Sequence, residues 1–114
     1  MKSGSEADQV YIAHMLECIE RVKTYTADGE SVFRQSRLVQ DAVIRNLQVM
    51  AESSQRLSES TKMIAADVPW RSISGFRNIM VHDYLGLDLD VIWSVVSQEL
   101  LSLELALSKI KGFN

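Results

Sequence analysis

The sequence predicts an all-α protein that folds as an antiparallel four-helix bundle with one or two short extra helices. The chain of 114 residues has one proline and five glycines. No segment alternates apolar and polar residues as a half-buried strand does. Apolar residues instead recur every three or four positions, which gathers them on one face of a helix. The length suits a single domain over residues 1–114, and a hydrophobic fraction of 46% is enough for a core.

The first helix is expected from about Ala7 to Thr26, after a flexible tail of about residues 1–8. Asp28 and Gly29 provide its stop signal. A short helix or turn is expected around residues 31–35. The apolar stripe of this first helix comprises Ile12, Met15, Ile19 and Val22.

The second helix is expected from Arg37 to about Leu57, and residues 58–67 are read as ambiguous, with a short separate helix as one reading. Pro69 fits the first turn of a third helix, where its missing N–H costs nothing. This third helix should stop before Gly86. The inner face of the second helix comprises Val39, Val43, Leu47, Met50 and Leu57.

The fourth helix is expected from an N-cap at Asp88 to about Lys111, with Gly112 beyond its end. It has more apolar residues than one stripe requires. A second set lies on roughly the opposite side and favours a partner, either another copy or another protein. The alternative is that a neighbouring helix wraps further round. The first set is Leu89, Ile92, Val96, Leu100, Leu103, Leu107 and Ile110, and the second is Val91, Val95, Leu101 and Leu105.

Composition favours a cytoplasmic protein. The single cysteine, Cys18, cannot form an intrachain disulfide. No apolar run is judged long enough to cross a membrane, and residues 1–9 carry no signal-peptide core. The net charge is −3, but residues 31–82 hold seven basic and four acidic side chains. A local basic surface there can attract phosphates, although solvated pairs such as Asp41 with Arg45 are the alternative.

The most informative stretch is Arg77-Asn78-Ile79-Met80-Val81-His82-Asp83-Tyr84. Arginine is a permanent cation that matches phosphate geometry, and histidine exchanges protons near neutral pH. The pair is sufficient to cleave RNA without a metal. The 2'-hydroxyl attacks the neighbouring phosphorus, His82 acts as general acid or base, and Arg77 stabilises the added negative charge. Alone, Arg-x4-His is a weak pattern.

The surroundings of this stretch make it specific. Gly75-x-Arg77-Asn78 and Val81-His82-Asp83-Tyr84-x-Gly86 follow Pro69-Trp70-Arg71, and Gln40-Asp41-Ala42-Val43-Ile44-Arg45-Asn46-Leu47 lies upstream. Both blocks, at this separation, closely resemble the HepT-like toxins of the HEPN superfamily. The resemblance runs from the first helix to the last.

This resemblance implies a small helical ribonuclease of a type VII-like toxin–antitoxin system, with a site formed across a homodimer. It implies a minimal nucleotidyltransferase antitoxin as partner and RNA as substrate, with no membrane partner. It also implies that the antitoxin silences the toxin by nucleotidylation (AMPylation) of Tyr84. The antitoxin uses ATP and magnesium for this, whereas the chain itself needs no cofactor.

Geometry leaves two arrangements of the site open. Arg77 and His82 would lie roughly 140° apart on a straight helix. Either the helix ends near His82, or two copies supply a pair of arginines and a pair of histidines at a two-fold axis; the resemblance supports the second. Asn78 shares a face with His82 and is expected to orient it or a phosphate oxygen. Asp83 tunes His82, holds a partner's arginine or caps the next turn. Tyr84 also reads as a half-buried aromatic.

The other candidate residues give weaker evidence for a functional site. His14 and Cys18 are four residues apart, but a zinc site needs three or four protein ligands, so no metal site is predicted. Arg37, Arg45 and Arg71 are read equally as RNA contacts or as ion-pair partners. Two functions are alternatives to the ribonuclease. One is a non-catalytic HEPN module that binds a nucleotidyltransferase and helps hold its substrate, and the other is a plain helical dimerisation domain.

Overall fold

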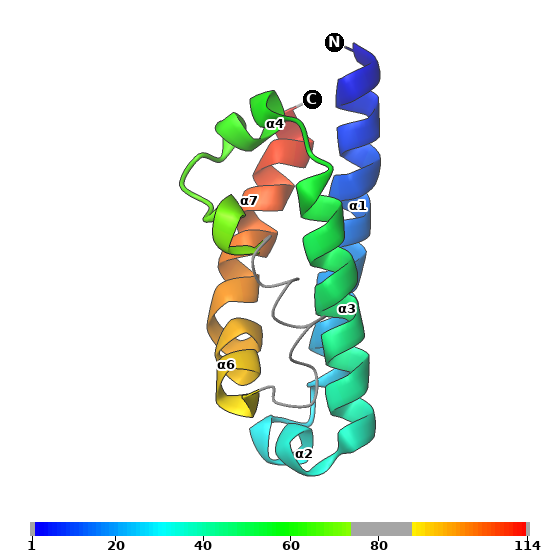
Figure 1. The fold of residues 1–114 in the computed structure, drawn as a ribbon, viewed down its shortest axis with the longest axis vertical. Coiled ribbons are helices and arrows are strands. Elements are labelled where there is room, and N and C mark those ends of the chain that lie inside the picture. The colour runs from blue at the N-terminus through cyan, green and yellow to red at the C-terminus, as the bar shows by residue number, and fades with distance from the viewer. Residues whose placement is uncertain (1, 74–87, 114) are drawn as a thin grey trace.

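The computed structural model describes residues 2–73 and 88–113, and these lie almost entirely in helices, with no strand among them. The all-α prediction is therefore confirmed. The described side chains are those of residues 6–73 and 88–111. Figure 1 shows the arrangement. The helices are α1 (Lys2–Tyr25), α2 (Glu30–Gln35), α3 (Arg37–Gln55), α4 (Glu59–Ile64), α6 (Leu89–Ser94), the π-helical turn η2 (Val95–Glu99) and α7 (Leu100–Phe113).

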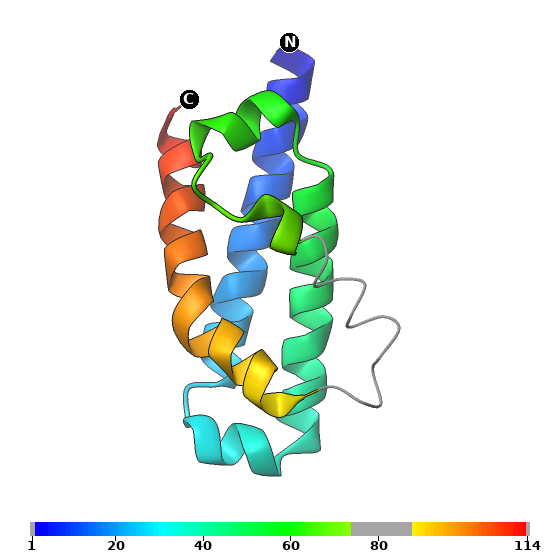
Figure 2. The same cartoon turned by 60° about the vertical axis from the view of Figure 1, so that its left-hand side comes forward.

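Three long columns run side by side along the long axis of the molecule: α1, α3, and the continuous run of α6, η2 and α7 (Figures 1 and 2). Helix α1 packs against both α3 and α7, and it runs in the opposite direction to each of them. Helix α2 closes one end, and α4 lies across the other end, beside the two termini. The third predicted helix falls largely on residues 74–87, outside the described residues, so the four-helix bundle remains a prediction.

The core forms where the three columns meet. The predicted stripe of α1 is buried throughout, with no member more than 1% exposed. Phe33 closes the core from α2. The largest fully buried side chains are Phe33, Ile12, Met15, Ile19, Leu47, Ile92, Leu107 and Ile110. The short helix or turn expected around residues 31–35 is the helix α2, and residues 58–67, for which the sequence was ambiguous, contain the helix α4.

Helix α1 begins at Lys2 rather than Ala7, so residues 2–8 of the predicted tail are helical. Asp8 explains part of this difference, because it is buried and ties α1 to the start of α4. Its carboxylate accepts hydrogen bonds from the Ser58 amide at 3.1 Å, the Ser58 hydroxyl at 2.5 Å and the Thr61 hydroxyl at 2.5 Å. Burial alone would raise the pKa of Asp8, but these donors outweigh it and hold the pKa below 3.8.

The helix ends follow side-chain chemistry. Ser36 caps α3 by accepting a hydrogen bond from the Val39 amide at 3.1 Å. Gly29, at φ 96°, takes a backbone conformation that other residues rarely adopt and so allows the turn into α2. The last helix runs through Gly112 to Phe113, so the predicted stop at Lys111 is wrong by two residues.

The π turn η2 is a feature that the sequence analysis did not predict. The Leu100 amide bonds to the Val95 carbonyl, five residues back, and the Ser97 hydroxyl donates to the Trp93 carbonyl at 2.8 Å. A π turn adds one residue and so shifts the helix phase by about 100°. In an uninterrupted α-helix, Ile92 and Leu100 would lie about 80° apart. The π turn brings both onto the core, where they are 0% and 3% exposed.

The same shift divides the second apolar set, so the prediction that its four members cluster on one side of the helix is wrong. Val91 and Val95 line a cavity that Met50 of α3 also lines. Leu101 and Leu105 point elsewhere and are 61% and 65% exposed. An exposed apolar surface on this helix is therefore present, but it consists of two separate parts.

The run Leu89–Lys111 is long and apolar enough to cross a membrane by length and composition alone, contrary to the sequence analysis. The core helix of a soluble protein passes the same test. Here one face of the run, including Ile92 and Leu107, is buried in the core with α1 and α3. The observation is therefore weak evidence for a membrane span.

We expect deletion of Gln98, an exposed residue of η2, to be tolerated. Removing one residue converts the π turn into ordinary α-helix and leaves the phases of α6 and α7 intact. Thermal unfolding followed by circular dichroism should show a melting temperature within about 4 °C of the parent, which corresponds to about 1 kcal/mol for a domain of this size.

Deletion of Glu104, in regular α-helix, is the matched control. It rotates Leu107 and Ile110 out of the core by about 100°, and each displaced side chain should cost about 2–5 kcal/mol. If the two deletions destabilised the protein equally, the π turn would not be what keeps the two halves of this helix in register.

Candidate functional site

The predicted site residues Arg77, Asn78, His82, Asp83 and Tyr84 all lie outside the described residues, within 74–87. The structure therefore tests neither their separation nor their assigned roles. It does describe the residues on either side of this segment and the upstream block on α3. These positions show how the fold holds the two ends of the segment that carries the motif.

Trp70 fixes the first end. Its indole Nε1–H donates to the Ala65 carbonyl at 3.1 Å and the Lys62 carbonyl at 3.3 Å. The same two carbonyls accept backbone hydrogen bonds from the Val68 amide and the Ala65 amide, each at 3.1 Å, so Trp70 adds a second donor to each and ties residue 70 to the end of α4. The first helical residue here is Trp70. Pro69 therefore stands immediately before the helix rather than in its first turn, where the sequence predicted it. The Ile73 amide bonds back to the Pro69 carbonyl at 3.1 Å, which closes the first helical turn.

Asp88 fixes the second end and confirms the predicted N-cap. Its carboxylate accepts a hydrogen bond from the Asp90 amide at 2.8 Å. Asp90 also forms an ion pair with Arg34 of α2, and Arg34 in turn pairs with Glu30 at 2.8 Å. Nearby, the rings of Phe33 and Trp93 pack with centroids 5.3 Å apart. The chain is therefore attached to α2 immediately after residues 74–87, the segment that carries the motif.

The upstream block on α3 is largely structural. Gln40 donates from its side-chain amide to the Phe33 carbonyl at 2.9 Å and the Arg34 carbonyl at 3.1 Å, which caps the end of α2. The nearly buried Asn46 donates to the Ala42 carbonyl at 2.9 Å. Val43 and its neighbours face the core. Arg45 is exposed, and the side chain of Asp41, the other charged residue of this block, is 46% exposed.

The basic character of residues 31–82 is partly neutralised. Asp41 pairs with Arg37 at 3.2 Å, rather than with Arg45 as suggested by spacing, and Arg34 is held by two carboxylates. Within residues 2–73 and 88–113, Arg45 and Arg71 form no ion pair and are exposed. These two arginines are the better candidates for contacts with phosphate.

The pair His14 and Cys18 does not form a shared site on α1. His14 is exposed, whereas Cys18 is only 3% exposed. Burial raises the pKa of the Cys18 thiol, which disfavours the thiolate that metal binding and nucleophilic chemistry require. Among the described residues, no three His, Cys, Asp or Glu side chains come together as metal ligands.

Sequence reasoning missed two structural contributors, Asp8 and Gln40. The signal for Asp8 was weak, because only the Ser-x-x-Thr pattern at Ser58 and Thr61 indicated a cap that a distant carboxylate could join. Gln40 lies four residues after Ser36, the cap of its helix, and nothing local indicates that its side chain reaches back to α2. Both interactions depend on tertiary contact.

Comparison with known proteins decides the family. Residues 15–110 match the family model described as Ribonuclease HepT-like. The chain belongs to this family. The match includes both blocks of the motif, and it confirms the resemblance identified from their residues.

The most similar relatives cover nearly all of the chain. A Methanocaldococcus jannaschii protein, whose name pairs gamma-glutamylcyclotransferase with a proposed RNase, is 33% identical over 103 residues. That match covers 90% of this chain and 46% of the relative. The chain thus spans about half of that protein.

Two other relatives match over most of their own length. The mRNA nuclease HepT of Shewanella oneidensis is 31% identical, with 89% of this chain and 93% of the relative covered. The probable ribonuclease HepT of Thermococcus cleftensis is 28% identical, with 89% and 93% covered. No solved structure shows a significant match.

Proposed function

We propose that the protein is a metal-independent endoribonuclease toxin that acts on RNA in the cytoplasm. The observation that carries this proposal is the family match over residues 15–110, which contains both Arg77 and His82. The name of the Shewanella relative, an mRNA nuclease, supports RNA as the substrate class. Arginine and histidine are the groups that cleavage through the 2'-hydroxyl needs.

In the proposed reaction, the 2'-oxygen attacks the adjacent phosphorus and displaces the 5'-oxygen of the next nucleotide. His82 transfers the protons, as general base for the 2'-hydroxyl or general acid for the leaving 5'-oxygen. Arg77 stabilises the negative charge that accumulates on the phosphoryl oxygens. Asn78 orients His82 or a phosphate oxygen. Asp83 tunes the proton affinity of His82.

We place this site at the two-fold axis of a homodimer. The angle of roughly 140° between Arg77 and His82 on a straight helix supports a site that takes groups from two copies. The exposed leucines of α7, Leu101 and Leu105, supply apolar surface of the kind that dimerisation buries.

We further propose that a minimal nucleotidyltransferase antitoxin silences the protein by transferring a nucleotidyl group from ATP to Tyr84. The tyrosine lies two residues after His82. A phosphodiester attached there would occupy the position of the substrate phosphate, and its charge would attract Arg77.

The alternative is a non-catalytic helical module that binds a nucleotidyltransferase. The presence of Arg77, His82 and Tyr84 together favours the enzyme, because a module that only binds has no need of all three.

The purified protein should cleave RNA in the presence of EDTA and leave a 2',3'-cyclic phosphate on one product and a 5'-hydroxyl on the other. Arg77→Ala and His82→Ala should each lower the rate by about 10²–10⁴-fold, because each removes a group that acts in the transition state. Product ends are identified by mass spectrometry of a defined oligoribonucleotide.

Matched controls are Arg21→Ala and His14→Ala, which remove the same side-chain types from exposed positions on α1. Both should cut at the parental rate. Loss of cleavage in EDTA, or full activity of His82→Ala, would contradict the mechanism.

Sedimentation equilibrium at micromolar concentration should give twice the chain mass of 12.9 kDa. If the two copies share a site, mixing inactive Arg77→Ala and His82→Ala chains should restore activity. A mixed dimer then regains one site with the arginine of one chain and the histidine of the other. A clean monomer, or a mixture that stays inactive, would contradict a site built from both copies.

Incubation with the cognate nucleotidyltransferase, ATP and magnesium should add a nucleotidyl mass to Tyr84 and abolish cleavage. Tyr84→Phe should escape both effects, whereas Tyr25→Phe, at a tyrosine that is 38% exposed, should not. Tandem mass spectrometry locates the label. Inhibition of Tyr84→Phe by the antitoxin would indicate silencing by binding alone.

A further inference from the structure

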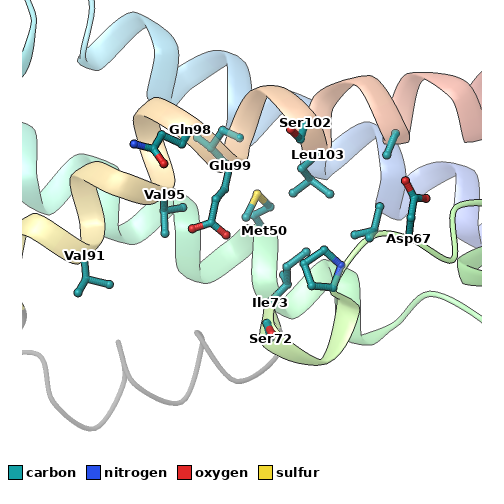
Figure 3. Close-up of a pocket in the computed structure, with 14 residues that line it drawn as sticks. Met50, Asp67, Ser72, Ile73, Val91, Val95, Gln98, Glu99, Ser102 and Leu103 are labelled. Carbon is teal, nitrogen blue, oxygen red and sulfur yellow. The ribbon is translucent and has the colours of Figure 1, made fainter.

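An elongated cavity of about 420 Å³ opens between α3, residues 67–73 and the run of α6, η2 and α7 (Figure 3). Its wall is mainly aliphatic. Figure 3 shows Met50 of α3 and Ile73 facing Val95 and Leu103 across it. A cavity of this size and polarity lies within the range that proteins use to bind ligands.

The π turn forms one wall of this cavity. Val95, Gln98 and Glu99 all line it, and all three belong to η2. The phase shift of this turn places Val91 and Val95 on the same side as Ala106 rather than beside Leu105. Single π turns within α-helices occur frequently at functional sites. The irregular turn and the cavity are therefore two observations that point to one place.

The length of the wall indicates the kind of occupant. From Val91 to Ala106 the helix rises by about 22 Å at 1.5 Å per residue. A compact small molecule would contact only part of such a wall. An extended peptide of roughly seven residues spans that distance. The dimensions favour a segment of polypeptide.

The charge at the rim indicates its chemistry. Asp67 and Glu99 line the cavity and are exposed. Within the described parts of the chain, neither carboxylate has a cationic partner, and the neighbouring Arg71 does not line the cavity. Two unpaired carboxylates repel a phosphate backbone and attract cations. The cavity is therefore unsuited to RNA and complementary to an apolar segment that carries positive charge.

We propose that this cavity binds a segment of a partner protein that inserts aliphatic side chains and carries lysine or arginine beside them. The aliphatic side chains fill the space between Met50 and Val95, and the cations pair with Asp67 and Glu99. The described residues that line this cavity do not include the catalytic residues assigned above, and the proposal does not depend on RNA cleavage.

Selection from a random library of roughly 12-residue peptides on the full-length protein tests the proposal. Enriched peptides should combine Leu, Ile or Val with nearby Lys or Arg. Fluorescence anisotropy should show at least tenfold weaker binding to Val95→Lys, which places a cation in the cavity. The double variant Asp67→Asn with Glu99→Gln should bind several-fold more weakly, and the difference should shrink in high salt.

Leu38→Lys is the matched control, because it makes the same kind of change at an apolar position of α3 that is 80% exposed and does not line the cavity, and it should bind like the parent. Circular dichroism establishes that each variant is folded. Equal binding to Val95→Lys, enrichment of acidic peptides or competition by an oligoribonucleotide would overturn the proposal. So would a loss of dimer mass in Val95→Lys, because a second copy would then occupy the cavity. Since no cleavage is measured, failure here leaves the ribonuclease proposal standing.

Discussion

The need to keep one apolar face of a long helix on the core constrains the whole structure. The residues between Leu89 and Phe113 pack with α1 and α3, but the spacing from Ile92 to Leu100 does not suit an uninterrupted α-helix. The π turn at Val95–Glu99 resolves this by adding a residue. One local irregularity therefore secures the core contacts of Leu103, Leu107 and Ile110, and it places Val95 in the wall of the cavity that Met50 also lines.

Interactions between distant parts of the chain then fix the ends of the columns. At one end, Asp8 joins α1 to the start of α4; at the other, Arg34 joins α2 to Asp90. A further exposed pair, Lys23 with Glu104 at 3.3 Å, links α1 to α7. Exposed ion pairs contribute little stability individually. The pair of Arg34 with Asp90 matters for geometry, because it holds to α2 the point at which the chain leaves residues 74–87.

The sequence predicted the helical class, the short helices and the cap at Asp88, because each depends on local patterns of apolar residues or turn chemistry. It missed the π turn, since the phase of a helix is set by the surface that it packs against. It missed the role of Asp8 because Ser58 and Thr61 lie about 50 residues away. The motif of Arg77 and His82 identified the family, whereas its geometry remains a prediction, since cooperation of the two groups depends on helix ends and neighbouring copies rather than on spacing.

Both ends of the chain lie at the α4 end of the molecule, far from α2 and the start of α6 (Figure 1). A domain attached to either end of this fold would therefore be placed beside α4 and leave the opposite end free. The Methanocaldococcus jannaschii relative, of which this chain covers 46%, carries additional sequence that could be accommodated in this way. For the same reason, affinity tags or fluorescent proteins fused at the α4 end should leave the α2 end of the fold accessible.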